Sequence, residues 1–439
     1  MKTFEEYLKE SKEKLGLKIP CSIEILTPVH IGSGVKLTEG IDFIKTDHSV
    51  QIISQSELME YLKNNPDELD RFINGNYNLN SLRRTPEGRT YFLNVGRARE
   101  IIEFERNGFG KPYIPGSSLK GAIRTIILKT AFDRLDNTQK QDLLKKVNSN
   151  KKEWAAEPIV KEIFGDDSNH NLMRVLEIFD AEFEEINLEK VLILSLTNEE
   201  GTSYGWKLMG KPSKNVPDPN RATWIFVEAL PIGSKGYTSI SLSKFFFSDP
   251  VAINELKFNE PTLSNIRNLI STINEYSLSK LTSEKGFFER LRTPANLIDL
   301  IKNIDSLISQ FNELTQDEFI MRISWGSGWK GMTGDFVDDL MKNDYKKWID
   351  FFRDKYCDGL KMKMGRPGFK IFPKTRRIVF EDDKPKYLTG WIKVKLNDTK
   401  LVEIKRQNDA QNHQRTTDNF DAATVLSQKF KVTEKKKKN

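Results

Sequence analysis

At residues 110–130 the chain reads GKPYIPGSSLKGAIRTIILKT, a turn followed by the start of a helix. Its two prolines disfavour helix before Gly116, because proline fixes its own φ and pushes the preceding residue into extended geometry. Ser117 or Ser118 can then cap the first free backbone N–H groups. From Leu119 onward, apolar residues recur at intervals of three and four, which predicts one buried stripe along the helix.

Two cations, Lys120 and Arg124, lie four residues apart on another face near the start of this helix. A helix N-terminus offers unpaired N–H groups and the positive end of the helix dipole, so the segment predicts a phosphate site. A nucleotide-binding P-loop is excluded, because Gly121 is followed by Ala122 instead of Lys-Ser/Thr. An ordinary buried helix with two solvent-facing cations fits the residues equally well.

Three further stretches contain glycine turns or clustered cations. Residues 23–34, IEILTPVHIGSG, predict a strand over 21–28 that runs into a glycine loop. Residues 319–324 predict a strand that leads into the turn WGSGW at 325–329. Residues 372–377 read FPKTRR, and residues 388–391 read LTGW.

Together, TPVHIGSG, IPGSSLKGAIRT, WGSGW and FPKTRR with LTGW resemble the RAMP superfamily of CRISPR-associated proteins, which are RNA-binding chains. Their order and the chain length are similar to those of the subunit that caps the 3′ end of the crRNA in type III-A Csm effector complexes. The resemblance implies an α+β fold with two ferredoxin-like, RRM-type domains, helical insertions and glycine-rich loops. We expect the domains at 1–240 and 241–404, with a polar, disordered tail at 405–439.

The resemblance also implies a non-catalytic subunit that holds the 3′ part of the crRNA by its backbone, caps the filament and supports crRNA maturation. Its implied partners are the crRNA, the target RNA paired to the guide, the other Csm subunits, mainly the repeated backbone subunit, and a recruited host nuclease. The implied RNA-binding residues are His30, Gly32, Ser33, Gly34, Gly116, Ser117, Ser118, Lys120, Arg124, Trp325, Gly326, Ser327, Gly328, Trp329, Lys374, Arg376 and Arg377.

Composition is compatible with this function without proving it. The 439 residues include 69 Lys and Arg against 62 Asp and Glu, a net charge of +7 that many proteins without nucleic acid share. Two cysteines exclude a disulfide framework, and the four histidines have no metal-site spacing, so we expect no metal or other cofactor. No apolar run reaches the roughly 20 residues of a membrane span, and the start lacks a signal-peptide core, which predicts a cytoplasmic protein.

Two basic segments carry aromatic residues. Residues 361–377 contain seven Lys and Arg and no acidic residue, with Phe369 and Phe372 among them, which favours contact with single-stranded RNA. An insertion expected over 50–110, with a helix around Leu58 and Leu62, carries five arginines in its second half, Arg83, Arg84, Arg89, Arg97 and Arg99. These arginines can clamp phosphates or pair with local carboxylates, and the sequence leaves both open.

Residues 197–222 are polar and rich in glycine and proline. RAMP subunits carry a projecting β-hairpin "thumb", and this segment is the candidate for it, with Tyr204, Trp206 and Lys207 facing bases or a partner subunit; a surface loop is the alternative. Elsewhere we expect a strand at 39–44 paired with the first strand, and strands at 175–179 and 191–196 paired with each other. Further strands are expected at 224–230, 237–242, 379–380 and 387–396, and apolar stripes predict helices over 263–273 and 297–311.

No catalytic residue can be assigned from the sequence. His30 precedes the glycine loop, and some RAMP relatives that cut repeat RNA use a histidine as general base, so a repeat-RNA endoribonuclease is one alternative function. The target-cutting backbone subunit of these complexes carries an aspartate just after its glycine loop, where this chain has Val35 and Lys36. A capping subunit of a type III-B complex is the other alternative.

Overall fold

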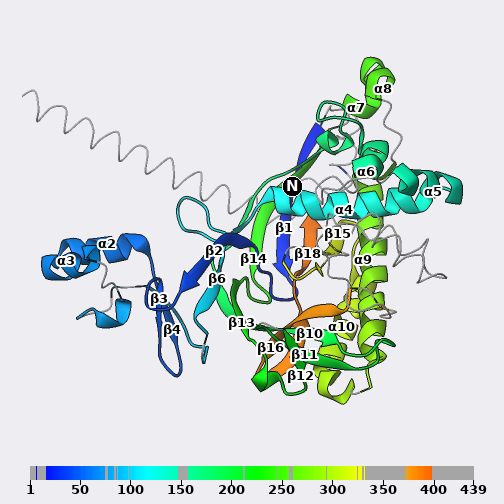
Figure 1. Ribbon diagram of the computed structural model, residues 1–439. Helices are drawn as coiled ribbons and strands as arrows, with labels where there is room; N and C mark the ends of the chain where they lie inside the picture. The colour runs from blue at the N-terminus through cyan, green and yellow to red at the C-terminus, as the bar shows by residue number, and fades with distance from the viewer. Residues whose placement is uncertain are drawn as a thin grey trace, which may run out of the picture.

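The computed structural model of the protein contains two β-sheets and the helices that pack on them (Figure 1). The structure describes residues 6, 16–74, 78–83, 86, 88–96, 98–146, 157–210, 213–243, 245–256, 261–292, 294–323, 325–328, 331, 371 and 373–397. The predictions for Trp329, for Arg84 and Arg97, for residues 361–370 and Phe372, and for the tail at 405–439 lie outside these residues.

The first sheet has the strand order β15-β18-β1-β14-β9-β7, with β8 also paired to β14. Its strands are β1 (Gly16–Ile25), β7 (Tyr113–Ile114), β8 (Leu176–Ile178), β9 (Ala181–Glu182), β14 (Lys235–Ser243), β15 (Glu318–Arg322) and β18 (Trp391–Leu396). Along β1 the alternate residues Ile19, Cys21 and Ile23 are buried, because successive side chains of a strand point to opposite faces. This face packs against α4 (Gly116–Arg134) and the first half of α9 (Ile266–Glu289).

The order of these elements along the chain is ferredoxin-like. A βαββαβ unit is formed by β1, α4, β8, β14, α9 and β18, and Figure 1 shows α4 crossing the sheet. The predicted helix start at Gly116 is confirmed, and the apolar stripe of α4 is buried at Leu119, Ile123 and Ile126. The α+β fold class predicted from the sequence is confirmed.

The second sheet has the order β12-β11-β10-β13-β6-β2, and β16 pairs with both β10 and β17. Its strands are β2 (Gly32–Thr38), β6 (Glu100–Phe104), β10 (Asn187–Leu196), β11 (Tyr204–Leu208), β12 (Lys214–Val216), β13 (Ile225–Ala229), β16 (Thr375–Glu381) and β17 (Lys384–Leu388). One face is covered by the second half of α9 and by α10 (Ile298–Gln310), with Leu194, Phe288 and Ile304 in the shared core. Both apolar stripes predicted to be core helices are therefore confirmed.

Several predicted strand pairings are wrong. The first strand pairs with β14 and β18, whereas residues 39–44 do not join it. The strands β8 and β10 lie in different sheets, so they do not pair with each other. The expected boundary at residues 240–241 does not separate two sheets, because β18 pairs with β1 and β16 pairs with β10. Partners far apart in sequence decide these pairings, and short local patterns do not encode them.

Residues 43–91 contribute most of a lobe that projects from the two sheets, at the left of Figure 1. It contains a separate sheet of β3 (Phe43–Lys45), β4 (Val50–Ile53) and β5 (Gly88–Tyr91), with α2 (Gln55–Lys63), α3 (Pro66–Ile73) and the short 3₁₀ helix η1 (Leu79–Ser81). The predicted helix around Leu58 and Leu62 is α2, and both leucines are buried. Ser54 caps this helix by accepting a hydrogen bond from the Glu57 N–H.

The remaining elements are short and lie between the strands and helices named above. They are α5 (Asn137–Lys146), α6 (Glu157–Phe164), α7 (Phe245–Ser248), α8 (Pro250–Leu256), η3 (Leu172–Val175), η4 (Pro219–Arg221), η5 (Pro261–Leu263), η6 (Pro294–Leu297) and η7 (Phe311–Glu313). Within the described residues, none of the helices combines the length and the apolar character that crossing a membrane requires.

Candidate nucleic-acid interface

Three of the motif segments meet at the turn before β18. The Gly390 N–H donates to Pro28 O at 2.9 Å, and Gly390 O accepts from the Ile323 N–H at 2.8 Å. The Trp391 N–H donates to Thr27 Oγ1 at 2.9 Å. Residues 27–28, 323 and 390–391, which lie far apart in the sequence, are therefore held together by two backbone hydrogen bonds and one to the Thr27 hydroxyl.

The turn at 325–328 depends on its glycines. Gly326 has a φ of +97° and Gly328 a φ of +75°, which lie in the left-handed region that favours glycine. A Cβ atom on Gly326 would lie 2.0 Å from Thr389 Oγ1. The same hydroxyl donates to Trp325 O at 3.3 Å, so Gly326 lets the turn pack directly on Thr389.

Trp325 contacts both His30 and Arg377. Its ring meets the His30 ring edge to face, with centroids 5.3 Å apart, and Arg377 Cζ lies 4.4 Å from a Trp325 ring centroid. Within the described part of the chain, Arg377 Nε has no hydrogen-bond partner and the guanidinium forms no ion pair. Burial lowers the pKa of Arg377. A cation that is held by an aromatic ring without a carboxylate is a suitable contact for phosphate.

His30 is 1% exposed, and its Nδ1 lies 2.6 Å from Glu228 O. Because a carbonyl oxygen only accepts, Nδ1 carries the proton and Nε2 is left with its lone pair; Nε2 has no partner among the described residues. Burial lowers the pKa of His30, Arg377 acts in the same direction, and the hydrogen bond to Glu228 opposes them. The predicted RNA contact of His30 is wrong, because its buried ring supports Trp325 instead.

The neighbouring arginines of β16 point to opposite faces of the sheet, as successive strand residues do. Arg377 reaches Trp325, whereas Arg376 Nε donates to Glu284 Oε2 on α9 at 2.6 Å. Arg376 Cζ also lies 4.1 Å from the centre of the Phe287 ring. Both arginines were predicted to contact RNA, but they lie on opposite faces, and only Arg377 lies on the face with Trp325.

The first glycine loop forms an irregularity of β2, where the register with β6 shifts between Gly32 and Lys36. Gly32 and Gly34 are exposed, and Gly34 has a φ of +89°. Ser33 Oγ donates to Glu103 Oε2 at 3.1 Å and accepts from the Val35 N–H at 3.1 Å. The exposed backbone of this loop is consistent with the predicted phosphate contact.

The start of α4 differs from the prediction. Its N-cap is Pro115, with no side-chain cap, so the expected serine cap is wrong. The Gly116 N–H donates to Asp180 Oδ1 at 2.7 Å, and a Cβ atom on Gly116 would lie 2.1 Å from Ile178 O. Gly116 therefore allows close packing against β8, and its N–H is not available to a phosphate. Ser117 is exposed and Ser118 is half-buried.

Lys120 and Arg124 do not join the cluster around Trp325. Arg124 Cζ lies 4.9 Å from the centre of the Phe164 ring on α6. Burial lowers the pKa of both residues, and for Lys120 the charge of Glu177 opposes this effect. Neither forms an ion pair within the described part of the chain. They remain predicted phosphate contacts, but at a separate place.

The thumb segment contains a hairpin of β11 and β12 that pairs with β10, so it is more structured than the sequence suggests. Trp206 is 3% exposed, and its ring lies 5.0 Å from that of Phe380 in the core. The prediction that Trp206 faces bases or a partner subunit is therefore wrong. Half-buried Tyr204 packs edge to face on it. Lys207 follows on the opposite face, near Lys374, whose pKa is lowered by burial and by Lys207.

Two arginines of the insertion, Arg83 and Arg89, pair with carboxylates. Glu228 is 0% exposed and binds Arg89 at 3.2 Å, Arg106 at 3.1 Å and the Tyr91 hydroxyl at 2.7 Å. Burial favours a raised pKa of Glu228, but the two arginines and the hydrogen bonds outweigh it and hold the pKa below its usual value. Arg83 pairs with two acidic residues of α3. The alternative of local ion pairs is confirmed for Arg83 and Arg89.

Sequence reasoning missed Arg322, the last residue of β15. Its Nε donates to Thr389 O at 2.8 Å, and its Nη2 donates to Gly326 O at 3.0 Å. Burial lowers the pKa of Arg322 to about 10; Glu284 opposes this effect, and Arg376 and Arg377 add to it. Its position three residues before the predicted WGSGW turn was the available signal, but in the sequence Arg322 resembles an ordinary exposed strand residue.

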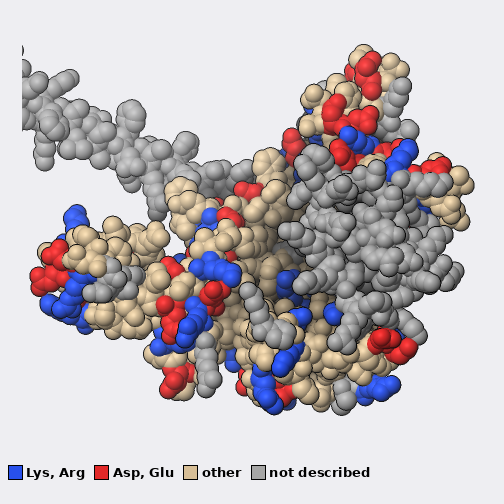
Figure 2. Space-filling model, viewed as in Figure 1, with Lys and Arg blue, Asp and Glu red and all other residues tan. Residues whose placement is uncertain are grey.

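The distribution of charged side chains does not identify an RNA-binding face on the visible surface. Figure 2 shows Lys and Arg mixed with Asp and Glu over the visible described surface, not gathered in one patch. Among the described residues, no group of three or more His, Cys, Asp or Glu side chains is arranged to hold a metal ion. The candidate interface therefore rests on the local geometry of the glycine turns and Arg377.

Comparison with known proteins gives a family match, a short match to a curated protein and solved structures of similar fold. The model of the RAMP superfamily matches residues 22–329. The CRISPR system Cms protein Csm5 of Streptococcus thermophilus is 61% identical over 36 residues, which are 8% of this chain. The match spans only 10% of that relative's length.

Two solved structures share the fold. One is a chain of the type III-A Csm-crRNA-target RNA ternary complex, with a TM-score of 0.57 and 20% identity over 86% of this chain and 100% of that chain. The other is Csm5 of T. onnurineus, with a TM-score of 0.55 and 18% identity over 84% of this chain and 99% of that chain. Because the family model covers more than half of its residues, this chain belongs to the RAMP superfamily.

Proposed function

We propose that the protein is an RNA-binding subunit of a type III-A CRISPR effector complex that holds the 3′ part of the crRNA by its backbone and caps the subunit filament. Membership of the RAMP superfamily, the short match to Csm5 and the fold shared with a chain of a Csm-crRNA-target RNA complex support this proposal. Its partners are then the crRNA, the target RNA paired to it and the neighbouring Csm subunits, in the cytoplasm.

The observation that carries the proposal is the convergence of two glycine turns with Arg377. The two turns share His30 as a neighbour, because Trp325 packs edge to face on its ring and a Cβ on Gly32 would lie 3.2 Å from its Nε2. Arg377 lies against the same tryptophan. Backbone amides and an arginine recognise phosphates, which are the same whatever the base. A subunit whose guide changes in sequence requires this kind of contact.

We assign the contacts to two places. The main surface consists of Gly32, Ser33, Gly34, Trp325, Gly326, Ser327, Gly328 and Arg377, and Lys207 and Lys374 extend it along the sheet. The exposed start of α4, with Ser117, Ser118, Lys120 and Arg124, is a second phosphate contact. The protein acts without catalysis of its own, and the trimming of the crRNA is then the work of a recruited nuclease.

Burial of His30 argues against the endoribonuclease alternative, because a general base must reach the proton that it removes. Incubation of the purified protein with repeat RNA checks this point. We expect no cleavage by the wild type; cleavage that disappears in His30→Ala would support the alternative function.

Photo-crosslinking in the assembled complex tests the proposed function most directly. A crRNA with crosslinkable nucleotides near its 3′ end should link to peptides that contain residues 27–34 or 325–328. The same nucleotides placed near the 5′ end should not link to this subunit. Links from the 5′ end alone, or links only to other subunits, would contradict the proposal.

A further inference from the structure

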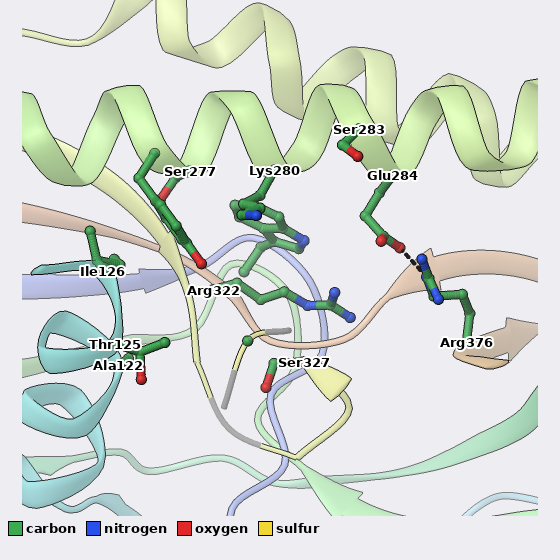
Figure 3. Close-up of a pocket in the computed structure, with 13 residues that line it drawn as sticks. Ala122, Thr125, Ile126, Ser277, Lys280, Ser283, Glu284, Arg322, Ser327 and Arg376 are labelled. Atoms are coloured by element: carbon green, nitrogen blue, oxygen red, sulfur yellow. Dashed lines mark hydrogen bonds and ion pairs between the residues drawn. The ribbon is translucent and has the colours of Figure 1, made fainter. Parts of the chain in front are cut away.

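A cavity of about 80 Å³ lies between α4, α9 and the turn at 325–328 (Figure 3). Thr125 of α4, Lys280 and Glu284 of α9, and Ser327 of the turn line it. This volume is several times the roughly 15 Å³ that a single water molecule needs, so the cavity has room for a larger polar group.

Cations dominate the lining of this cavity. Lys280, Arg322 and Arg376 face one carboxylate, Glu284, which is already paired with Arg376 at 2.6 Å. Figure 3 shows the Arg322 guanidinium extending between α9 and Ser327. Two of its five N–H groups donate to the carbonyls of Thr389 and Gly326, so others remain for a ligand. The described residues of the lining therefore carry an excess of two positive charges.

A second observation points to an acceptor in the same place. Trp391 lines the cavity and is 1% exposed, and its indole Nε1–H has no acceptor among the described residues. A buried N–H without a partner costs about 1–3 kcal/mol, and such groups are rare in folded proteins. An oxygen atom of a bound anion would satisfy this donor.

We propose that this cavity binds a phosphate group at the 3′ end of the guide RNA. The proposal rests on the function proposed above for the identity of the RNA. A terminal phosphomonoester carries about −1.5 to −2 charges at neutral pH, which matches the excess of the lining better than the single charge of a backbone phosphodiester. The cavity lies on the side of β16 where Arg376 meets α9, away from Arg377, so an RNA end reaches it more readily than a continuous strand.

The test compares guide RNAs of one sequence that end in a 3′ phosphate, a 3′ hydroxyl or a 5′ phosphate, bound to the full-length protein. We expect the 3′-phosphate guide to bind about tenfold more tightly than the 3′-hydroxyl guide, which equals about 1.4 kcal/mol. Lys280→Gln and Trp391→Phe should each reduce this ratio towards one. We choose these variants because Arg322 also supports the turn.

Lys302→Gln is the matched control, because Lys302 is an exposed lysine on α10 outside the cavity lining, and it should keep the full ratio. Inorganic phosphate provides an independent probe, and it should raise the melting temperature of the wild type more than that of Lys280→Gln. A 5′-phosphate guide that alone shows the gain would overturn the assignment to the 3′ end.

Equal affinity of the wild type for all three guides, with no stabilisation by inorganic phosphate, would overturn the cavity as a phosphate site while leaving the proposed function intact. Stabilisation by inorganic phosphate without discrimination between RNA ends would reject the terminal phosphate as the ligand. No binding of any guide would instead contradict the proposed function itself.

Discussion

Arg377 places its guanidinium carbon 4.4 Å from the centre of a Trp325 ring, on the side of β16 opposite to Arg376. A partly buried cation–π contact contributes on the order of 1–2 kcal/mol, and it fixes the plane of the guanidinium while leaving its edge free to donate hydrogen bonds. His30 contacts the same tryptophan and holds it from the core side. The arrangement positions a cation beside the turn without neutralising it.

Lys120 and Arg124 test whether the start of α4 is a second phosphate contact. We expect Lys120→Ala to lower the affinity several-fold, by about the same factor for guides of every sequence. Arg124→Ala should have the same effect on affinity, and it should also lower the free energy of unfolding because the contact with Phe164 is lost. Anisotropy titrations with two unrelated guides measure this. Because these residues lie apart from Arg377, Lys120→Ala and Arg377→Gln should be additive in binding free energy. Unchanged affinity in both alanine variants would remove the α4 contact.

The turn at 325–328 predicts different costs for its two glycines. Gly326→Ala should lower the free energy of unfolding by about 3 kcal/mol or more, because its Cβ would clash with Thr389 Oγ1 at 2.0 Å in addition to the strain of a positive φ. Gly328→Ala should cost only about 1 kcal/mol, since nothing lies within 4 Å of its Cβ position. Urea denaturation measures both. A similar cost for the two variants would show that the contact with Thr389 is unimportant.

The hairpin of β11 and β12 predicts that neighbouring residues have different roles. Trp206→Ala should destabilise the protein by about 3–5 kcal/mol, because a large buried aromatic side chain is lost from the core. Lys207→Gln should leave the free energy of unfolding within about 0.5 kcal/mol and weaken RNA binding. Denaturation and RNA titration on both variants separate these effects. A stable Trp206→Ala protein with impaired RNA binding would restore the exposed role predicted from the sequence.

His30 predicts a loss of stability in mildly acidic solution. Burial lowers the pKa of His30 in the folded protein below its ordinary 6.5, so the unfolded chain takes up the proton first as the pH falls. The stabilising effect of neutral His30 is therefore complete above about pH 6.5 and is lost as the pH falls below it, at no more than about 1.4 kcal/mol per pH unit.

The free energy of unfolding measured between about pH 8 and pH 5.5 checks this dependence. Burial raises the pKa of Glu189 to about 7, so protonation of Glu189 stabilises the fold over the same range in both proteins. His30→Asn, which cannot titrate but keeps an N–H donor, should lack the loss caused by His30, and the difference between the two profiles isolates it. Glu228 does not interfere, because its lowered pKa places its effect at more acidic pH. Identical profiles for wild type and His30→Asn would contradict the buried, neutral state of His30.

Local patterns predicted the helices and the fold class well. The stripe that begins at Leu119 and the stripes of α9 and α10 arise from residues three and four apart, which lie within one element, and the structure confirms them. Strand partners were not predictable in the same way. The pairing of β1 with β18 joins residues from the two ends of the described chain, and neither strand carries a local signal for the other.

The motifs identified the place of the candidate site better than the roles of its residues. The sequence grouped Arg376 with Arg377, but strand alternation sends them to opposite faces. It also assigned a phosphate contact to Gly116. The Gly116 N–H instead donates to Asp180, and the lack of a Cβ atom allows close packing against Ile178. Burial decides such roles, and burial depends on contacts between segments that a single sequence does not reveal.

The central claim is that Arg377, held on Trp325 beside two glycine turns, binds RNA phosphates without reading bases. The salt dependence of the RNA affinity of Arg377→Gln tests this claim most directly. Affinities of wild type, Arg377→Gln and the exposed control Lys384→Gln should be measured over a range of salt with two guides of equal length and unrelated sequence. We predict that Arg377→Gln loses about tenfold affinity for both guides and lowers the slope of log K against log salt by about one, while Lys384→Gln matches the wild type. A loss confined to one guide, or an unchanged slope and affinity, would contradict the account.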